Sequence, residues 1–236
     1  MLSIVVDKKD VNADYVSITN EKDIRHMVNV YRLKVGDNIR VTDGTYQYLC
    51  SLLKISKKEV LARIENKEED IYNLSINIDV AVGLIKNDKM NLLIQKLTEI
   101  GVSGIIPLKT ERVVVKLDTK KDKWEDIVTE SMKQCRAIRR TKILDIMKLS
   151  DIDFSLYDKV IYLYENSCES IKINEAVTKQ DKNVLCIIGP EGGFTQHECS
   201  KLTEKGAIEI SLGNRILRAE TAAIVVSAVL AHIYGY

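Results

Sequence analysis

The sequence has no run of 18 uninterrupted apolar residues, no Cys-x-x-Cys pair and only three histidines. Without such a run, no membrane-spanning helix is predicted. The apolar stretch inside Met1–Lys9 is too short for a signal peptide, and no basic region precedes it. We therefore expect a cytosolic protein.

The five cysteines are scattered, at Cys50, Cys135, Cys168, Cys186 and Cys199. An odd count without metal-ligand spacing indicates reduced, mostly structural thiols in a reducing compartment. No histidine lies near a cysteine pair, so no metal is expected even though His197 and Cys199 are close in sequence.

Charge is balanced overall but unevenly distributed. The chain of 236 residues has a formal net charge of +1, 45% hydrophobic residues and 29% charged residues, the composition of an ordinary globular protein. Residues 1–73 are neutral, residues 74–142 carry fourteen basic against nine acidic side chains, and residues 143–236 carry nine against thirteen. An anionic partner is therefore sought in the middle third.

The first 72 residues have the pattern of a small β-barrel. Short β-branched or aromatic runs alternate with turn signals such as Asp43-Gly44, and they predict strands at Ser3–Val6, Tyr15–Ile18, Asn38–Thr42, Gln47–Ser56 and Glu59–Glu65. One helix is predicted over Glu21–Val30. A barrel of this kind binds RNA or gives structural support, and the pattern does not decide between them. The polar stretch Asn66–Asn73 marks the domain boundary.

From Leu74 onward, predicted strands and helices alternate, which indicates an α/β domain with a parallel sheet covered on both faces. The predicted strands are Ile76–Leu84, Gly104–Leu108, Arg112–Lys116, Lys142–Met147, Lys159–Tyr164, Asn183–Ile188 and Ala207–Leu212. The predicted helices are Asn87–Ile100, Asp122–Arg140, a short one after Thr195 that Gly206 ends, and Ala219–Ile233.

Two of these strands end at glycine-containing loops, within Ile187–Thr221. Ligands collect at the carboxyl ends of parallel strands, and glycines allow close backbone approach. The first loop, Gly189-Pro190-Glu191-Gly192-Gly193, lacks the Gly-Lys-Ser/Thr of a phosphate loop. A small-molecule site and a plain tight turn both remain open for it.

Thr195-Gln196-His197-Glu198 has the spacing of a capping box, so these residues are interpreted as a helix start and not as catalytic groups. The second loop places Arg215, Arg218 and Glu220 in an apolar setting. An arginine there has a specified partner, either Glu220 or a ligand. The last helix is apolar almost all round and must be covered by the sheet, its own loops or another subunit.

Basic residues gather around the end of the predicted helix Asp122–Arg140. Arg136 and Arg140 share a face, and lysines precede the helix. A solvated helix end and a phosphate-binding surface explain this cluster equally well.

Together, these motifs resemble the RsmE family of bacterial 16S ribosomal RNA methyltransferases, in the SPOUT superfamily. The long motifs are Gly-Pro-Glu-Gly-Gly-Phe at 189–194 and Leu-Gly-Asn-Arg-Ile-Leu-Arg-Ala-Glu-Thr-Ala at 212–222. Supporting blocks are Lys89-Met90 with Gln95–Val102, Pro107-Leu108 with Glu111-Arg112, Glu130 with Gln134, and His26, Arg32 and Gly36-Asp37. The chain departs from the family pattern in its opening residues and also at Ala137, Thr141 and Ala219.

The resemblance implies a small PUA-like β-barrel over residues 1–72, which binds RNA, and a SPOUT methyltransferase domain over residues 73–236. The latter is implied to contain a trefoil knot and to form a homodimer. S-adenosyl-L-methionine is the implied cofactor, held by Leu163, Glu165, Gly189, Pro190, Glu191, Gly192, Gly193, Leu212, Gly213, Ile216, Leu217, Arg218 and Thr221. The RNA contacts are implied at Arg32, Lys89, Arg112 and Arg136.

The expected reaction is methylation of N3 of one uridine in 16S ribosomal RNA within the small ribosomal subunit. N3 is a poor nucleophile until its proton leaves, so a base or a cation beside the uracil is needed. Arg218 is the expected cation, Glu220 its holder and Glu191 the weaker candidate for proton acceptor. Two alternatives remain: a SPOUT enzyme methylating another RNA nucleoside or a ribose, and a non-catalytic RNA-binding protein.

Overall fold

The computed structural model describes residues 1–71, 73–165 and 171–235, so Tyr72 and Cys168 lie outside the described residues. The chain divides into two compact units. The N-terminal unit comprises residues 1–73 together with 129–140, and the C-terminal unit comprises residues 74–128 together with 141–236. Helix α3 (Asp122–Cys135) therefore begins in one unit and ends in the other.

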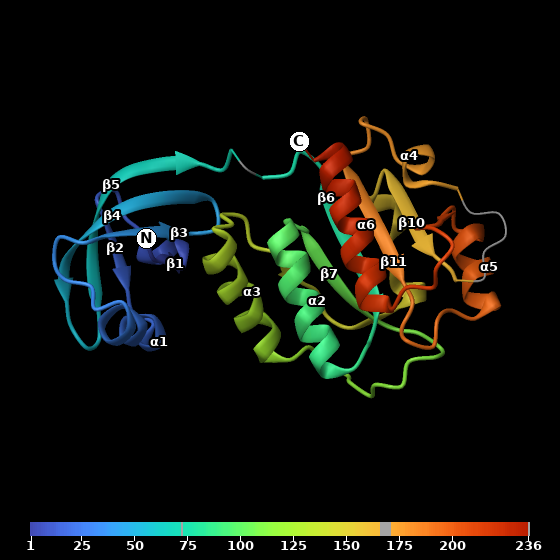
Figure 1. The fold of residues 1–236 in the computed structure, drawn as a ribbon, viewed down its shortest axis with the longest axis horizontal. Helices are drawn as coiled ribbons and strands as arrows, with labels where there is room; N and C mark the ends of the chain where they lie inside the picture. Colours follow the sequence, from blue (N-terminus) through green and yellow to red (C-terminus); the bar gives the residue numbers. More distant parts are fainter. Residues whose placement is uncertain (72, 166–170, 236) are drawn as a thin grey trace. The chain divides into compact units, whose positions relative to one another are not determined.

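The N-terminal unit is built on a five-stranded sheet (Figure 1). Its strands are β1 (Ser3–Val5), β2 (Tyr15–Ile18), β3 (Asn38–Thr42), β4 (Tyr46–Ile55) and β5 (Val60–Glu69). They lie in the order β1-β3-β4-β5-β2, and only the β1–β3 pair is parallel. Alternate residues such as Val41, Cys50 and Ala62 are fully buried in one core, as expected for a sheet with a single apolar face.

Helix α1 (Glu21–Arg25) continues into a π-helical turn over His26–Val30. Asn20 caps α1, because its side chain accepts hydrogen bonds from the backbone of Lys22 and Asp23. The prediction of one helix over Glu21–Val30 is confirmed in extent, while the change to π-helical bonding has no signal in the sequence pattern.

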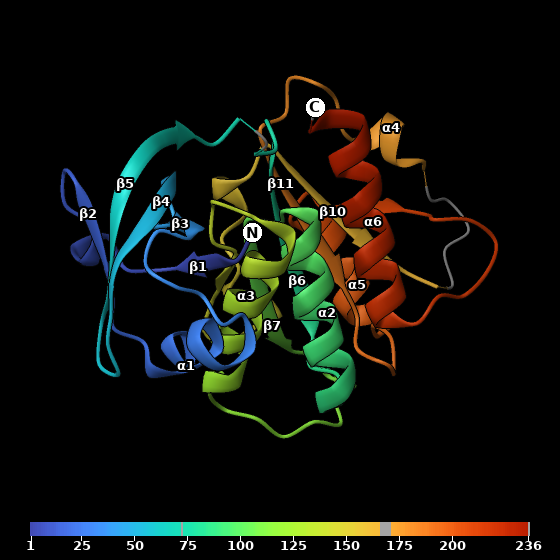
Figure 2. The same cartoon turned by 60° about the vertical axis from the view of Figure 1, so that its left-hand side comes forward.

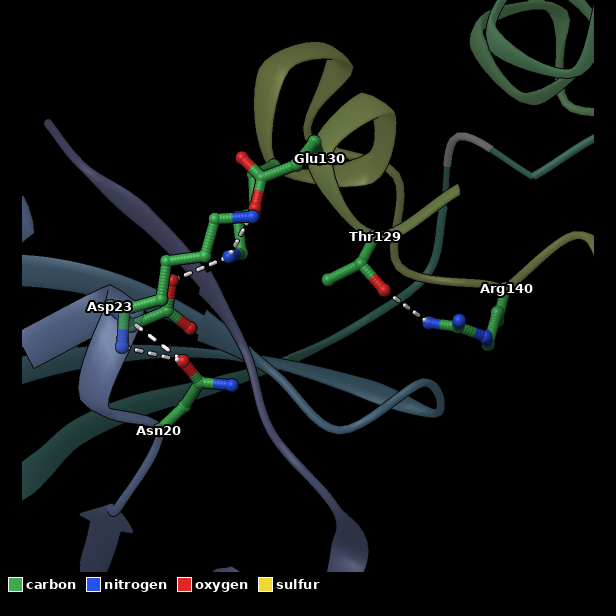
Figure 3. A network of polar contacts seen from close by, with 7 residues as sticks. Asn20, Asp23, Thr129, Glu130 and Arg140 are labelled. Atoms are coloured by element: carbon green, nitrogen blue, oxygen red, sulfur yellow. Dashed lines mark hydrogen bonds and ion pairs between the residues drawn. The ribbon is translucent and has the colours of Figure 1, made fainter. Parts of the chain in front are cut away.

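The second half of α3 is held inside the N-terminal unit by polar contacts (Figure 3). Lys133 Nζ donates to Asp23 Oδ1 at 2.5 Å and to Glu130 Oε1 at 3.1 Å, and Arg140 donates to Thr129 Oγ1 at 2.9 Å. The side chains of Asp23 and Lys133 are 7% and 13% exposed. A buried carboxylate with a paired ammonium ties α3 to α1, since breaking such a pair leaves an uncompensated charge.

The C-terminal unit is built on an all-parallel sheet, which confirms the predicted α/β class. The strands lie in the order β12-β10-β11-β6-β7-β8, and β9 also pairs with β7. The strands are β6 (Asn77–Gly83), β7 (Gly104–Lys109), β8 (Lys142–Ile143), β9 (Met147–Lys148), β10 (Lys159–Leu163), β11 (Asn183–Ile188) and β12 (Ile208–Ile210).

Helices cover both faces of this sheet. Helices α2 (Asn87–Ile100) and α6 (Ala219–Tyr234) lie side by side, and α6 packs on β6 and β11 (Figures 1 and 2). Alternate strand residues such as Leu185 and Ile187 form a second core with Leu202 of α5 (Gln196–Glu204). Because successive strand residues point to opposite faces, the nearly continuous apolar strands are buried on both sides. The short helix α4 (Ile173–Ala176) completes the unit.

Three of the predicted elements are wrong in extent or type. Arg112–Lys116 is not a strand: the Val113 N–H closes a turn onto Thr110 O, Val114 is 80% exposed, and among the described residues no strand pairs with this β-branched run. Helix α3 ends at Cys135 and not at Arg140, because Arg136 adopts φ +61°. The predicted strand Lys142–Met147 is also interrupted, leaving the two-residue strands β8 and β9.

Candidate functional site

A cleft of about 360 Å³ opens at the carboxyl ends of β10, β11 and β12. Leu163, Ile188 and Ile210, the last residues of these strands, form its floor. The loops that follow the strands supply the walls, together with Ala219 and Ala222 from the start of α6. Its volume lies in the usual range of small-molecule sites, about 300–1,000 Å³.

The first wall is the loop Gly189–Gly193, in which position 193 requires a glycine. Gly193 adopts φ +67° and donates its N–H to Pro190 O at 2.9 Å, closing a turn. The space that a Cβ would take at Gly193 is filled by the Glu165 carboxylate. A side chain at position 193 would therefore displace an acidic group of the cleft, so the tight turn and the ligand wall are the same feature.

The second wall is the loop Ser211–Leu217. Gly213 adopts φ +118°, and its N–H donates to the Ser211 hydroxyl at 3.1 Å. Ile216 is 78% exposed although it lines the cleft. An exposed apolar side chain at the mouth of a cleft is available to contact a bound molecule.

The structure brings most of the expected cofactor residues together. Those that line the cleft are Leu163, Glu165, Gly189, Pro190, Gly193, Leu212, Gly213, Ile216 and Leu217. Those that lie outside its lining are Glu191, Gly192, Arg218 and Thr221. Sequence reasoning missed Tyr164, Ile188, Ile210, Ser211, Asn214, Arg215, Ala219 and Ala222. All of them except Ile210 are next to an expected residue or end a predicted strand, and Ile210 lies inside the predicted strand Ala207–Leu212, so strand ends were the available signal.

Glu191 points toward α2. Its Oε1 accepts from the Lys86 backbone N–H at 3.2 Å and from Lys89 Nζ at 3.3 Å. Partial burial alone raises the pKa of this carboxyl, but the hydrogen bonds and the Lys89 charge outweigh it, so the pKa of Glu191 is lowered. A carboxylate held in its charged form is a weak proton acceptor, which argues against Glu191 as a general base.

The prediction that Arg218 pairs with Glu220 is wrong. Glu220 is buried at the start of α6, and the cation beside it is Lys89, whose Nζ lies 4.0 Å from Glu220 Oε1. Among the described residues, no ion pair joins Glu220 to Arg218, and Glu220 Oε2 is buried without a hydrogen-bond partner. Arg218 is the N-cap residue of α6 and is exposed, so its guanidinium is free to meet a ligand.

Arg112 braces the first wall of the cleft. Its Nη1 donates to Gly192 O and to Phe194 O, both at 3.2 Å. A Cβ on Gly192 would come within 3.0 Å of the Arg112 Cβ, so these two segments of the chain lie in close contact. The guanidinium that was expected to contact RNA thus has backbone partners within its own unit.

Arg32 and Arg136 belong to the N-terminal unit, and both are exposed. They are the non-glycine residues with positive φ among those described, at +53° and +61°. Arg32 follows exposed Tyr31, whose ring lies 5.1 Å from the His26 ring in an edge-on contact. Strained backbone of this kind costs about 1–2 kcal/mol per residue and persists where the surroundings fix it.

The described cysteines are free thiols. Burial raises the pKa of the Cys199 thiol to about 12 and also raises that of Cys186, so neither ionises near neutral pH to act as a nucleophile. Within residues 1–71, 73–165 and 171–235, no group of three or more His, Cys, Asp or Glu side chains is placed to hold a metal ion. No helix in that part of the chain is long and apolar enough to cross a membrane.

Two family models match the chain in tandem. Residues 72–231 match an RNA methyltransferase domain, and residues 18–65 match an RNA methyltransferase PUA domain. The first match contains the cleft and both of its walls. The second covers most of the five-stranded sheet and the π-helical turn.

Known proteins are similar over nearly the whole chain. Ribosomal RNA small subunit methyltransferase E of Bacillus subtilis is 34% identical, over 87% of this chain and 85% of that protein. The enzyme of the same name from Buchnera aphidicola subsp. Acyrthosiphon pisum is 30% identical, over 98% and 92%. Ribosomal RNA small subunit methyltransferase E of Neisseria gonorrhoeae, solved with S-adenosyl methionine, superimposes with a TM-score of 0.88 at 25% identity, covering 100% of this chain and 98% of that one.

A methyltransferase from Legionella pneumophila, solved with the bound cofactor SAM, superimposes with a TM-score of 0.86 at 27% identity. The alignment covers 100% of this chain and 98% of that one. The two cofactor-bound structures thus share both units of the fold, and not the parallel sheet alone.

Proposed function

Because the chain belongs to the RNA methyltransferase family that carries an N-terminal PUA domain, we propose that it methylates N3 of one uridine in 16S ribosomal RNA. The protein is an S-adenosylmethionine-dependent ribosomal RNA methyltransferase. The observation that carries the proposal is the cleft at the ends of β10, β11 and β12, built from the two glycine loops.

The cleft fits the cofactor in chemistry as well as in size. Apolar side chains such as Ile188 and Leu217 offer surface to a purine, and the loop backbones offer hydrogen-bonding groups. The Glu165 carboxylate is the acidic group of the lining, suited to hydroxyls or to a positive charge. When bound, S-adenosylmethionine supplies an activated methyl group on a sulfonium, so the protein's task is positioning and proton management.

Arg218 is proposed to stand beside the reacting base. Its neighbours Leu217 and Ala219 line the cleft, while its own side chain is exposed at the N-cap of α6. A guanidinium there would stabilise the anion left when uridine N3 loses its proton. Because its contacts lower the pKa of Glu191, we do not propose this carboxylate of the glycine loop as the acceptor of that proton.

RNA binding is proposed for the PUA-like domain, residues 1–72, with methyl transfer in residues 73–236. The proposed phosphate contacts are Arg32 of this domain and Arg136 of the segment 129–140 in the same compact unit, because both are exposed and held in a left-handed conformation. Exposed Tyr31, beside Arg32, offers a ring on which an unpaired base can stack. Their loss is expected to weaken binding and to lower its salt dependence, by about one phosphate per arginine.

A homodimer formed through the C-terminal unit is also proposed, with 16S ribosomal RNA of the small subunit as the partner in the cytoplasm. Apolar groups left on the surface support the dimer, among them Leu92 of α2 and Ile233 of α6, 44% and 39% exposed. A trefoil knot in the C-terminal segment belongs to the same proposal, since residues 211–217 share one cleft with residues 163–165. Sedimentation equilibrium tests the dimer, and a monomer at micromolar concentration would contradict it.

The decisive experiment is nucleoside mass spectrometry of 16S ribosomal RNA after incubation with the protein and labelled S-adenosylmethionine. We expect labelled 3-methyluridine. A different methylated base, or a labelled ribose, would favour another SPOUT activity. Calorimetric titration with S-adenosylhomocysteine separates the enzyme from a pure RNA-binding protein, which has no reason to bind it.

Arg218 is tested by Arg218→Ala, with Lys201→Ala at an exposed position of α5 outside the cleft lining as the control. Loss of a cation aimed at a developing anion costs roughly 10²–10³-fold in rate. We expect such a loss of kcat in Arg218→Ala, with S-adenosylhomocysteine affinity nearly retained. Unchanged methylation in a folded Arg218→Ala protein would remove this assignment.

A further inference from the structure

Lys89 lies outside the cleft yet pairs with two segments beside it, the first wall and the first turn of α6. Its ammonium is 3.3 Å from Glu191 of the first glycine loop and 4.0 Å from Glu220 of α6. The side chains of Lys89 and Glu191 are each 29% exposed, and that of Glu220 is 9% exposed. Three segments about 100 and 30 residues apart in sequence therefore meet at one half-buried charge cluster.

The contact with Glu191 fixes the glycine loop to α2. Lys86 is the N-cap residue of α2 and has no capping side chain of its own. The Glu191 carboxylate holds the backbone at this point from another part of the chain, because it accepts the N–H of Lys86 itself at 3.2 Å. A carboxylate at a helix N-terminus is favoured by the helix dipole, and Lys89 adds a direct opposite charge.

The contact with Glu220 concerns the start of α6, which also lines the cleft. Glu220 occupies the first turn of α6, between Ala219 and Ala222, which line the cleft. Its Oε2 is buried and unpartnered, and Lys89 is the one cation within 4.0 Å of its carboxylate among the described residues. Removing that cation would leave a buried charge uncompensated, so the first turn of α6 would shift to reach solvent or water.

From this geometry we propose that Lys89 is a positioning residue for the methyl-donor cleft, holding the glycine loop and the first turn of α6 in one arrangement. It therefore acts on cofactor affinity through Glu191 and Glu220, and not as a contact to an RNA phosphate. The inference rests on the proposed function, because it takes the cleft as the S-adenosylmethionine site. It goes beyond it by giving an ammonium outside the cleft control over the first wall and the first turn of α6.

The test compares Lys89→Met, Lys89→Arg and, as matched control, Lys201→Met at an exposed position of α5. Affinity for S-adenosylhomocysteine is measured by calorimetry, and affinity for a 16S ribosomal RNA fragment is measured across a salt series. We expect Lys89→Met to weaken S-adenosylhomocysteine binding about tenfold, the loss of one charge-assisted contact. KM for S-adenosylmethionine should rise likewise, with the RNA salt slope unchanged. Lys89→Arg should recover most of the affinity, and Lys201→Met should match the wild type.

Glu191→Gln keeps the proposal testable if Lys89→Met folds poorly, because Gln retains an acceptor for the Lys86 N–H and removes the ion pair; alone it should also weaken S-adenosylhomocysteine binding, and unchanged affinity would overturn the proposal. In a double-mutant cycle, Lys89→Met and Glu191→Gln should be coupled in S-adenosylhomocysteine affinity. Additive effects would overturn the proposal. So would a Lys89→Met protein with normal S-adenosylhomocysteine affinity, and an RNA salt slope reduced by about one would then assign Lys89 to phosphate. If the wild type binds no S-adenosylhomocysteine, the proposed function fails instead.

Discussion

Gly83→Ala tests how closely the sheet and the glycine loop must approach. Gly83 is the last residue of β6 and is buried. A Cβ at this position would lie 2.5 Å from Pro190 N and 2.6 Å from Pro190 Cδ, where ordinary contact begins at 3.4 Å. The loop backbone must therefore retreat by about 0.9 Å, the difference between 3.4 and 2.5 Å. Backbone cannot rotate away as the end of a side chain can, so the wall of the cleft moves as a unit.

The expected cost has two parts. Overpacking of a buried site destabilises by about 1–3 kcal/mol, which lowers a melting temperature by about 2–4 °C per kcal/mol in a chain of this size. Displacement of a positioning wall by about 1 Å costs up to roughly 10²-fold in catalysis. We expect a weaker S-adenosylhomocysteine titration by calorimetry and a lower kcat by methyl-transfer assay, with RNA affinity retained.

The control for Gly83→Ala is Gly44→Ala. Gly44 adopts φ +86° with open space around its Cβ position, and it lies in the N-terminal unit. An alanine there is strained by about 1 kcal/mol without touching the cleft, so stability should fall while cofactor affinity stays. If Gly83→Ala bound S-adenosylhomocysteine like the wild type and melted at the same temperature, the close approach of β6 to Pro190 would have no role in shaping the cleft.

Three further predictions follow from single contacts. Arg112→Ala removes both donors to the Gly192 and Phe194 carbonyls, so S-adenosylhomocysteine affinity should fall by about tenfold while the salt slope of RNA binding stays; a reduced slope in a calorimetric or filter-binding series would assign Arg112 to RNA. Asp23→Ala leaves the Lys133 ammonium buried without its main partner and should destabilise the N-terminal unit by about 3 kcal/mol, measured by urea unfolding, whereas the exposed-site variant Asp14→Ala should change little. The pKa of Glu191 is lowered in the folded state, so its stabilisation is fully present above the ordinary Glu value of 4.5 and is lost as pH falls through the folded pKa; the melting-temperature gap between wild type and Glu191→Gln should therefore be constant from about pH 6 to 8 and close in more acid buffer.

Elements with strong local signals are predicted well from the sequence. Helix α2 has the predicted bounds, because its apolar residues recur at helical spacing and Gly101, at φ +94°, ends it. The capping box at α5 is confirmed, since Thr195 Oγ1 accepts the Glu198 N–H at 3.2 Å and Glu198 Oε2 accepts the Thr195 N–H at 2.9 Å. Glu198 Oε1 also accepts the Glu111 N–H at 2.9 Å, a distant contact that the box pattern does not contain.

Elements that depend on neighbours far along the chain are predicted poorly. Residues 113–115 have strand propensity, but no strand among the described residues pairs with them, so the run forms a loop in which Val114 is exposed. Arg136 ends α3 by adopting a left-handed conformation that helix propensity would not suggest. The glycine loops were found because glycine marks the backbone directly, whereas the lining residues Ile188 and Ile210 became visible only as the ends of the strands that carry the loops.

The charged side chains show why the position of the site could be predicted from the sequence but its ion pairs could not. Arg218 and Glu220 are two residues apart, which made them the natural pair, yet residues at this spacing do not share a helix face. Glu220 turns toward α2, where Lys89 lies 4.0 Å away although 131 positions separate the two in sequence. The sequence does not say which basic residue pairs with Glu220, because the pairing with Lys89 depends on the packing of α2 on α6. The exchange of partners also changes the chemistry: it releases Arg218 toward the ligand and makes Glu220 part of the support of the cleft.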